Sequence, residues 1–225
     1  MTITFITGAN KGLGHETARR LLALGHTVIL GARNPALGTA AAQALGARFV
    51  PIDVTDDASV AAAAADIEQH EGHIDVLINN AGIHGPMGVP SAADTLDVLD
   101  VNVVGAVRTT TAFLPLLRRS ADPVIINVSS GMGSLELTND PARPESHVIA
   151  PAYTASKAAL TMLTNQYAKA LPDVRVNAAD PGYTATDFNG HSGPQTVTEG
   201  TDAVVALATE GPGHPSGRFL DRHAL

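Results

Sequence analysis

The chain has 225 residues, of which 44% are hydrophobic and only 16% are charged; this balance is typical of a globular protein and predicts a single domain spanning 1–225. Its formal net charge of −8 disfavours nucleic-acid binding, and the absence of cysteine excludes disulfides, thiolate metal sites and a cysteine nucleophile. No apolar run approaches the roughly 20 residues of a membrane span, and Ile3 opens a strand pattern with no leader before it. We therefore expect a cytoplasmic protein without membrane contact.

Short apolar runs alternate along the chain with longer segments of helical character. The runs rich in Val and Ile predict strands at Ile3–Thr7, Thr27–Gly31, Ala47–Ile52, Ile74–Asn79, Pro123–Ser129, Val174–Ala179 and Gly217–Leu220. The helical segments predict helices at Gly12–Leu24, Pro35–Leu45, Asp57–Glu71, Thr95–Leu117, Ala152–Ala170 and Val197–Thr209. This alternation predicts an α/β fold of the Rossmann type, a doubly wound parallel sheet of about seven strands with helices on both faces.

Two stretches depart from the alternation. His84–Ala93 is rich in Gly and Pro, which predicts a surface loop. Gly131–Pro151 is longer and is predicted to be a loop without regular secondary structure, a class that often forms functional lids. It contains three prolines and the apolar residues Met132, Leu135, Leu137, Val148 and Ile149. We interpret it as a pocket wall or lid that excludes water, or alternatively as a surface excursion or subunit contact.

A glycine-rich turn, Thr7-Gly-Ala-Asn-Lys-Gly-Leu-Gly14, connects the first predicted strand directly to the first predicted helix. Its glycines let backbone amides approach a pyrophosphate, and the positive end of the following helix favours the anion. No Asp or Glu occurs between Glu16 and Asp53, so the carboxylate that binds the ribose hydroxyls of NAD is missing. Lys11 and Arg33 instead predict a site for the extra phosphate of NADP, unless Arg33 is only an exposed residue at a strand end.

Asp53 follows the third predicted strand, in Ile52-Asp-Val-Thr-Asp-Asp57. It is a candidate for a hydrogen bond to the adenine edge of a nucleotide or for membership of a helix N-cap cluster. Both interpretations can hold, because Thr55 and Asp56 are better placed to cap the helix.

These residues and further motifs in the same order resemble the short-chain dehydrogenase/reductase family, in its compact, single-domain branch. The matching segments are Thr7–Gly14, Asn79–Gly82, Asn102, Val128–Ser130, Tyr153-x-x-x-Lys157 and Pro181–Tyr183. Ala-Asn-Lys-Gly in the turn and Ala-Arg after the second strand are similar to the carbonyl reductases that use NADPH. The resemblance implies a catalytic tetrad of Asn102, Ser130, Tyr153 and Lys157. The cofactor-binding residues it implies are Gly8, Asn10, Lys11, Gly12, Leu13, Gly14, Arg33, Asp53, Val54, Asn80, Ala81, Gly82, Tyr153, Lys157, Pro181, Gly182, Thr184 and Thr186.

The chemistry of these side chains suits proton transfer. Tyr153 and Lys157 are four residues apart and so share one helix face. A cation about 4 Å from the phenolate, at an effective dielectric near 20, is worth roughly 4 kcal/mol, enough to lower the pKa of Tyr153 by some 3 units. Ser130, or Ser129 if that side chain faces the pocket instead, would donate to the substrate oxygen. Asn102 is assigned by the resemblance to hold a water that connects Lys157 to solvent.

We therefore expect an oxidoreductase that uses NADPH to reduce small or medium apolar ketones or aldehydes, reversibly. The alternatives are an NAD-dependent alcohol dehydrogenase of the same fold and a regulator that senses NADPH without turnover. Tyr153 follows Ser130 by 23 positions, more than is usual in the family, so the substrate is not carried over. His84 and His147 are candidates for the pocket rim, whereas His70 and His73 lack a third ligand and no metal is expected. The oligomeric state stays open among monomer, dimer and tetramer.

Overall fold

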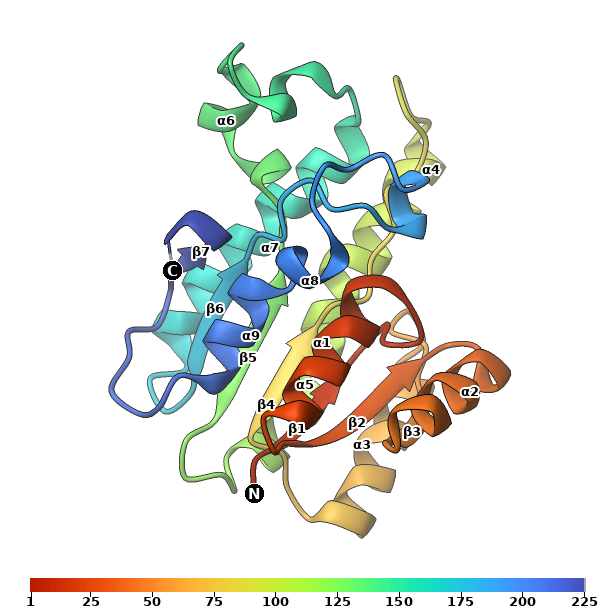
Figure 1. The fold of residues 1–225 in the computed structure, drawn as a ribbon, viewed down its shortest axis with the longest axis vertical. Coiled ribbons are helices and arrows are strands. Elements are labelled where there is room, and N and C mark those ends of the chain that lie inside the picture. The colour runs from red at the N-terminus through yellow and green to blue at the C-terminus, as the bar shows by residue number, and fades with distance from the viewer. Residues whose placement is uncertain (225) are drawn as a thin grey trace.

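Seven strands form one sheet in the computed structural model, which describes residues 1–224 (Figure 1). The strands are β1 Ile3–Ile6, β2 Thr27–Ala32, β3 Arg48–Pro51, β4 Val76–Asn79, β5 Val124–Val128, β6 Arg175–Ala179 and β7 Phe219–Leu220. Their order is β3-β2-β1-β4-β5-β6-β7, and every pairing is parallel. The prediction of a Rossmann-type, doubly wound parallel sheet is confirmed.

The core lies on both faces of the sheet, because successive residues of a strand point to opposite sides. Ile6 and Leu30 belong to one buried cluster, which α1 Gly12–Ala23, α2 Pro35–Leu45 and α9 Asp202–Thr209 complete. Phe5 and Ile29 belong to the other, to which α3 Asp57–Glu71, α5 Gly105–Leu117 and α7 Pro151–Ala170 contribute. The helices therefore cover both faces, as predicted.

The direction of winding reverses between β1 and β4, which are neighbours in the sheet. From β1 the chain proceeds outward to β3 and then returns to β4 on the other side. In open parallel sheets, ligands bind in the crevice at the carboxyl ends of the strands where this reversal occurs. The turn after β1 and the segment after β4 therefore mark the expected binding site.

The predicted helix Thr95–Leu117 is wrong at its start and in its regularity. α4 Ala92–Leu99 begins three residues earlier, because Ser91 and Asp94 form a reciprocal capping box. A π-helical turn, η1 Asp100–Val104, then connects α4 to α5. Such widened turns are frequent at functional sites, and this one contains Asn102.

The predicted helix Val197–Thr209 is also wrong, because it is two helices. α8 Val197–Gly200 ends where Gly200 packs so closely on Thr184 that a Cβ there would lie 2.3 Å from Thr184 Oγ1. α9 starts after Thr201, whose hydroxyl accepts a hydrogen bond from Arg20 of α1. A tertiary contact with the loop after β6 thus interrupts a continuous helical pattern.

The stretch Gly131–Pro151 contains three short helical segments, so the prediction of a structureless loop is wrong. They are η2 Gly131–Gly133, α6 Leu135–Asn139 and η3 Pro144–His147, and α7 begins directly at Pro151. Figure 1 shows α6 standing beyond the carboxyl edge of the sheet. The other predicted loop is confirmed up to Ser91, since no helix or strand occurs between β4 and α4. Within 1–224, no helix is long and apolar enough to cross a membrane.

Candidate nucleotide and catalytic site

The turn between β1 and α1 depends on glycines at the positions where the backbone approaches its neighbours most closely. Gly8 has a φ of +66°, and a Cβ added to it would lie 2.9 Å from Ala81 Cα. A Cβ on Gly14 would lie 2.5 Å from Asn80 Nδ2 and 2.7 Å from Gly8 O. The first turn of α1 has neither a side-chain cap nor an acidic residue. Its backbone N–H groups are therefore open to an anion, and the fit to a pyrophosphate group is good.

The segment after β4 holds this turn in place. Asn80 Nδ2 donates to Thr7 O at 2.8 Å and to Gly8 O at 3.1 Å. Thr7 Oγ1 accepts the backbone N–H groups of Asn80 and Ala81, both at 3.1 Å. Asn80 and Ala81 therefore lie beside the glycine turn, and the Thr7 hydroxyl, to which the sequence assigned no role, helps to hold them there.

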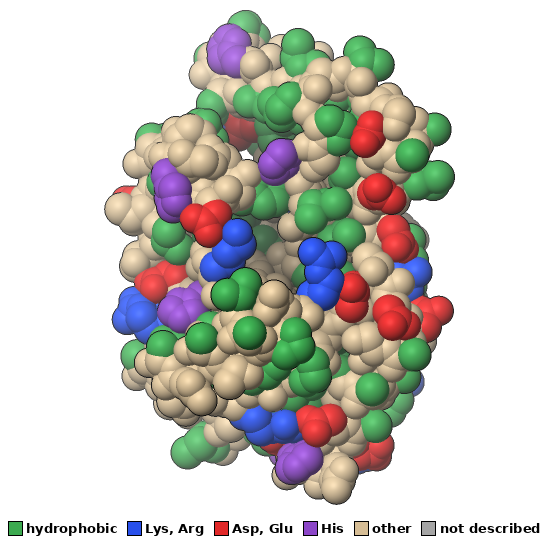
Figure 2. Space-filling view, turned by 90° about the vertical axis from the view of Figure 1, so that its right-hand side faces the viewer, with side chains coloured by type: hydrophobic (Ala, Val, Ile, Leu, Met, Phe, Trp, Pro, Cys, Tyr) green, Lys and Arg blue, Asp and Glu red, His purple; other side chains and the backbone are tan. Residues whose placement is uncertain are grey.

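Lys11 and Arg33 follow neighbouring strands, but their surroundings differ. Arg33 is exposed directly after β2. Lys11 forms an ion pair with Asp187 of η4 Asp187–Asn189, with 3.2 Å between Nζ and Oδ2. The Lys11 ammonium also holds the pKa of Asp187 below its usual value. Figure 2 shows a recessed region at mid-height of one face, with basic side chains on either side of it.

Asp53 is engaged locally, whereas Asp56 caps α3 through the N–H of Ala58. Asp53 Oδ1 accepts the N–H of Thr55 at 3.0 Å and its hydroxyl at 2.7 Å. Partial burial opposes ionisation of Asp53, but the bonds from Thr55 and the charge of Arg33 hold its pKa below the usual value. The prediction that a neighbour of Asp53 caps the helix is confirmed.

The side chains of Ser130, Tyr153 and Lys157 meet at the carboxyl end of β5. A side-chain hydrogen bond joins Ser130 and Tyr153, and Lys157 Nζ lies 5.5 Å from the centroid of the Tyr153 ring. Lys157 is buried and donates to Val128 O at 2.7 Å. The structure therefore brings together three residues of the predicted tetrad.

Ser129 faces away from this group. Its side chain is buried, and its hydroxyl donates to Lys157 O at 3.2 Å and bonds Thr161 Oγ1 at 2.7 Å. Ser129 is thus used to attach β5 to α7, and the geometry favours Ser130 for the role beside Tyr153.

The acidities of the pair differ from the sequence-based expectation. Burial raises the pKa of Tyr153 to about 12; the hydrogen bond with Ser130 opposes this and the charge of Asp180 adds to it. Burial lowers the pKa of Lys157 to about 8. The expectation that Lys157 depresses the pKa of Tyr153 is wrong for this structure, because both groups are desolvated and the ammonium is turned to the Val128 carbonyl. At neutral pH Tyr153 is a protonated phenol.

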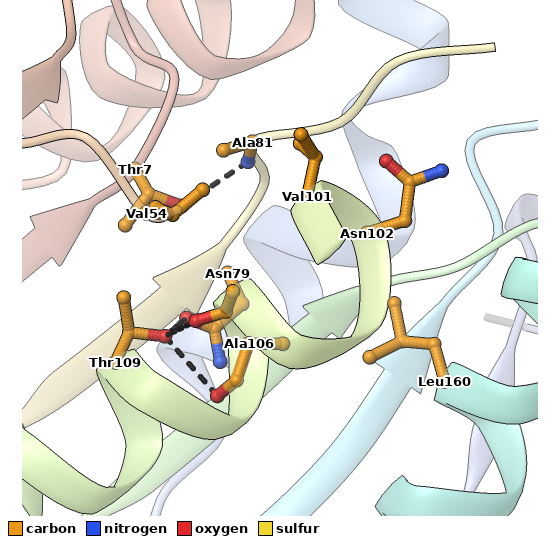
Figure 3. A pocket seen from close by; sticks show the side chains of 10 residues that line it. Thr7, Val54, Asn79, Ala81, Val101, Asn102, Ala106, Thr109 and Leu160 are labelled. Atoms are coloured by element: carbon orange, nitrogen blue, oxygen red, sulfur yellow. Dashed lines mark hydrogen bonds between the residues drawn. The ribbon is translucent and has the colours of Figure 1, made fainter. Parts of the chain in front are cut away.

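Asn102 connects the loop after β4 to α7. Its Nδ2 donates to Ile83 O at 2.8 Å and to Ser156 Oγ at 2.9 Å, while its Oδ1 accepts the N–H of Ile83 at 2.8 Å. Ser156 Oγ in turn donates to Tyr153 O at 2.7 Å. Asn102 also borders a cavity of about 10 Å³ between β1, β4 and η1 (Figure 3), which is close to the space that one water molecule needs.

The loop after β6 lies opposite the glycine turn and forms the other side of the candidate nucleotide site. Gly182 has a φ of +67°, and a Cβ there would lie 2.7 Å from Gln195 Oε1. Thr184 is buried and donates to Pro181 O at 3.0 Å. Thr186 approaches the glycine turn, with its Cβ 3.9 Å from a Cβ built on Gly12. A cavity of about 290 Å³ separates this loop from α1 and is lined by Gly12, His15, Glu16, Thr186, Asp187, His191 and Val197.

One aromatic ring packs beside Tyr153, and a second ring packs on the first. The Phe188 ring lies 5.7 Å from that of Tyr153, and His84 stands edge-on to Phe188 with 5.2 Å between centroids. His84 was a candidate from the sequence; Phe188 was not, because only its position two residues after Thr186 could have suggested it. His147 is exposed in η3.

Comparison with known proteins agrees with this arrangement. A family model described as short chain dehydrogenase matches residues 2–196. The chain is 35% identical to a short-chain dehydrogenase of Penicillium roqueforti, covering 97% of this chain and 93% of that protein. It is 33% identical to (-)-isopiperitenone reductase of Mentha piperita, covering 96% and 95%. The structure of NADPH-bound carbonyl reductase from chicken fatty liver superposes with a TM-score of 0.87 at 29% identity, covering 100% of this chain and 98% of that chain.

The family match extends over the glycine turn, the segment after β4, the Ser130–Tyr153–Lys157 group and the loop after β6. Nicotinamide dinucleotides are the cofactors of this family. The chain is therefore an oxidoreductase that uses a nicotinamide cofactor, and it belongs to the short-chain dehydrogenase/reductase family.

Proposed function

We propose that the protein is an NADPH-dependent reductase of small or medium apolar ketones and aldehydes, with Tyr153 as the proton donor. The observation that carries this proposal is the meeting of Ser130, Tyr153 and Lys157 beside a turn shaped for a pyrophosphate. Relatives named as a carbonyl reductase and an isopiperitenone reductase support the substrate class.

The roles follow from the acidities and contacts. A tyrosine with a pKa of about 12 is protonated at neutral pH, so it can donate a proton to the oxygen of the reduced carbonyl. Ser130, hydrogen-bonded to Tyr153, donates to the same oxygen as charge develops there. Asn102 holds the first turn of α7 in position, because it bonds Ser156, whose hydroxyl bonds Tyr153 O. Lys157 keeps a positive charge beside the phenol.

The residues that would hold the cofactor lie on three segments. The glycine turn Gly8–Gly14 and Asn80–Gly82 would hold the pyrophosphate side, and Pro181–Thr186 the nicotinamide side. Arg33 and Lys11 favour NADPH, because charge-assisted hydrogen bonds to a phosphate contribute roughly 1.5–3 kcal/mol each. NADPH, when bound, supplies the hydride.

The apolar character proposed for the substrate comes from the surroundings of Tyr153. The Phe188 ring lies beside that of Tyr153, and His84 lies edge-on to Phe188. The stretch 131–150 adds Met132 and Leu137, both half-buried, and Ile149 O accepts the N–H of Gly88 from the neighbouring loop at 3.0 Å. A small ketone would be shielded from water by these groups.

The test is a panel of carbonyl compounds, cyclic ketones included, offered with NADPH or NADH while cofactor absorbance is followed. We expect turnover with NADPH that Tyr153→Phe removes. Tight NADPH binding with no turnover of any member, unchanged by Tyr153→Phe, would instead identify a sensor of the cofactor.

A further inference from the structure

Asp180 is a buried acidic residue beside the catalytic group that the proposed reaction does not use. It follows β6 directly, and only 6% of its surface is exposed. Its backbone N–H donates to Leu220 O of β7 at 2.8 Å, so the sheet fixes its position. A carboxylate placed there is costly unless hydrogen bonds compensate for its burial.

The compensating hydrogen bonds come from two different turns of the site. Asp180 Oδ1 accepts the N–H of Gly182 at 2.9 Å, in the loop that lines the nucleotide cleft. The N–H of Gly131, the residue after Ser130, also bonds the carboxylate. The approach is close, because a Cβ on Gly131 would lie 2.9 Å from Asp180 Oδ2. One side chain therefore connects the turn that carries Ser130 to the turn that opens with Pro181.

The charge of Asp180 acts on α7. It raises the pKa of Tyr153, and it partly offsets the effect of burial on Lys157, whose pKa is lowered to about 8 with both contributions included. Glu145 of η3 and Asp221 after β7 also face Asp180. Burial, opposed by the Gly182 and Gly131 bonds and assisted by these two carboxylates, raises the pKa of Asp180 itself.

We propose that Asp180 is a positioning residue of the reductase site, whose carboxylate connects the Ser130 turn to the Gly182 turn and places a negative charge near Tyr153 and Lys157. The inference rests on the proposed function for its catalytic meaning. Because burial lowers the pKa of Lys157 to about 8, a negative charge close to this lysine favours its ammonium form.

The primary test is Asp180→Asn, which keeps the shape and one acceptor but removes the charge. The chain has only three lysines, Lys11, Lys157 and Lys169, so lysine-selective carbon-13 labelling lets NMR follow the titration of Lys157 separately. We expect its midpoint to fall by about half a pH unit or more, as loss of a nearby opposite charge requires. The kcat for the best carbonyl of the panel should fall about tenfold or more, with a smaller change in the KM for NADPH.

Two further variants distinguish the contact of Asp180 with the Ser130 turn from the effect of its charge on Lys157. Gly131→Ala should push the Ser130 turn away from Asp180 and lower kcat while the Lys157 midpoint stays in place. Glu145→Gln removes a carboxylate whose Oε1 lies 3.0 Å from the same Cβ position on Gly131, and it should move the Lys157 midpoint far less than Asp180→Asn does. Should Asp180→Asn fold poorly, Gly131→Ala tests the contact with the Ser130 turn while the charge is retained.

The outcomes distinguish this inference from the proposed function. An active wild type whose Asp180→Asn variant keeps both its kcat and its Lys157 midpoint overturns the role of Asp180 alone, as does a fully active Gly131→Ala. A wild type that reduces no carbonyl overturns the reductase proposal, and the lysine titration then still decides whether Asp180 controls Lys157. A purely structural role would lower the melting temperature of Asp180→Asn without moving the Lys157 midpoint, and this result would also reject the inference.

Discussion

The turn between β1 and α1 and the stretch between β5 and α7 both border the site, yet they are built in opposite ways. In the glycine turn, Cβ atoms added to Gly8 and Gly14 would meet their nearest neighbours at 2.9 and 2.5 Å, and Asn80 bonds the backbone of the turn twice. In the stretch 131–150, Leu135 is 83% exposed and Ile149 is 69% exposed, and three short helical segments replace a single ordered turn.

The difference reflects what each region has to bind. A pyrophosphate is identical in every nicotinamide dinucleotide and would be held by backbone N–H groups, so the backbone of the turn has to keep one path, and a Cβ at Gly8 or Gly14 would disturb it. A carbonyl substrate is recognised by side chains, which can be exchanged while the backbone path is kept. We therefore expect changes in the turn to be costly for all substrates, and changes in residues 135–148, beyond the Ser130 turn, to alter the choice among substrates.

The largest effect should come from Tyr153→Phe. This variant tests whether the residue between the two regions is the proton donor. Removing the proton donor should lower kcat by about 10²–10⁴-fold while NADPH affinity, measured by fluorescence titration, stays unchanged. Tyr167→Phe, on the same helix, is the matched control and should keep full activity. A phenylalanine variant at 153 with wild-type turnover would contradict the mechanism.

Gly14→Ala should distort the glycine turn between β1 and α1. The new methyl group would overlap Asn80 Nδ2 and Gly8 O, and such overpacking typically costs about 1–3 kcal/mol. We expect a lower melting temperature and weakened binding of both NADPH and NADH. Gly211→Ala, where no atom lies within 4 Å, is the control. Undiminished binding by Gly14→Ala would show that the turn is less constrained than its contacts indicate.

Arg33→Glu should change the choice between NADPH and NADH, while the contacts of the glycine turn stay the same. Loss of one charge-assisted contact to the ribose phosphate corresponds to roughly 10- to 100-fold weaker NADPH binding, whereas NADH binding should be spared. Isothermal titration with both cofactors measures this, and Arg118→Gln, which breaks an exposed pair with Asp173, serves as the control. Equal affinity of the wild type for both cofactors would refute the preference.

The rate of reduction should decline above pH about 8. In that range Lys157 loses its proton, while Tyr153, with a pKa of about 12, stays protonated. Burial lowers the pKa of Lys157, so this lysine loses its positive charge at a lower pH than an exposed lysine does. The rate is therefore expected to fall, and not to rise, as the pH increases. A profile of kcat/KM against pH measures the midpoint, and a rate that stays constant to pH 10 would exclude Lys157 as the titrating group.

Replacing residues 135–148 by a short turn should have the smallest effect on cofactor binding and on the catalytic residues. Relative activity towards bulky and small ketones should change several-fold, with NADPH affinity retained, because Leu137 and Glu145 of this segment lie beside Gly131 in the Ser130 turn rather than beside the glycine turn. If the substrate ranking is kept and only the oligomeric state changes, the stretch is an assembly element.

The sequence by itself determined the alternation of strands and helices, the glycine turn and the four-residue spacing of Tyr153 and Lys157. These features are local: buried parallel strands are continuous apolar runs, a positive φ calls for glycine, and helical spacing sets which side chains share a face. The seven strands and the helices on both faces could therefore be predicted before the tertiary structure was known.

Only the tertiary structure decided the choice of Ser130 over Ser129, the break of the last helical pattern at Thr201, the pairing of Lys11 with Asp187 and the high pKa of Tyr153. Each of these depends on which groups from distant segments come together and on how much water they exclude. Contact geometry and burial are properties of the folded chain, so no spacing along the sequence reveals them.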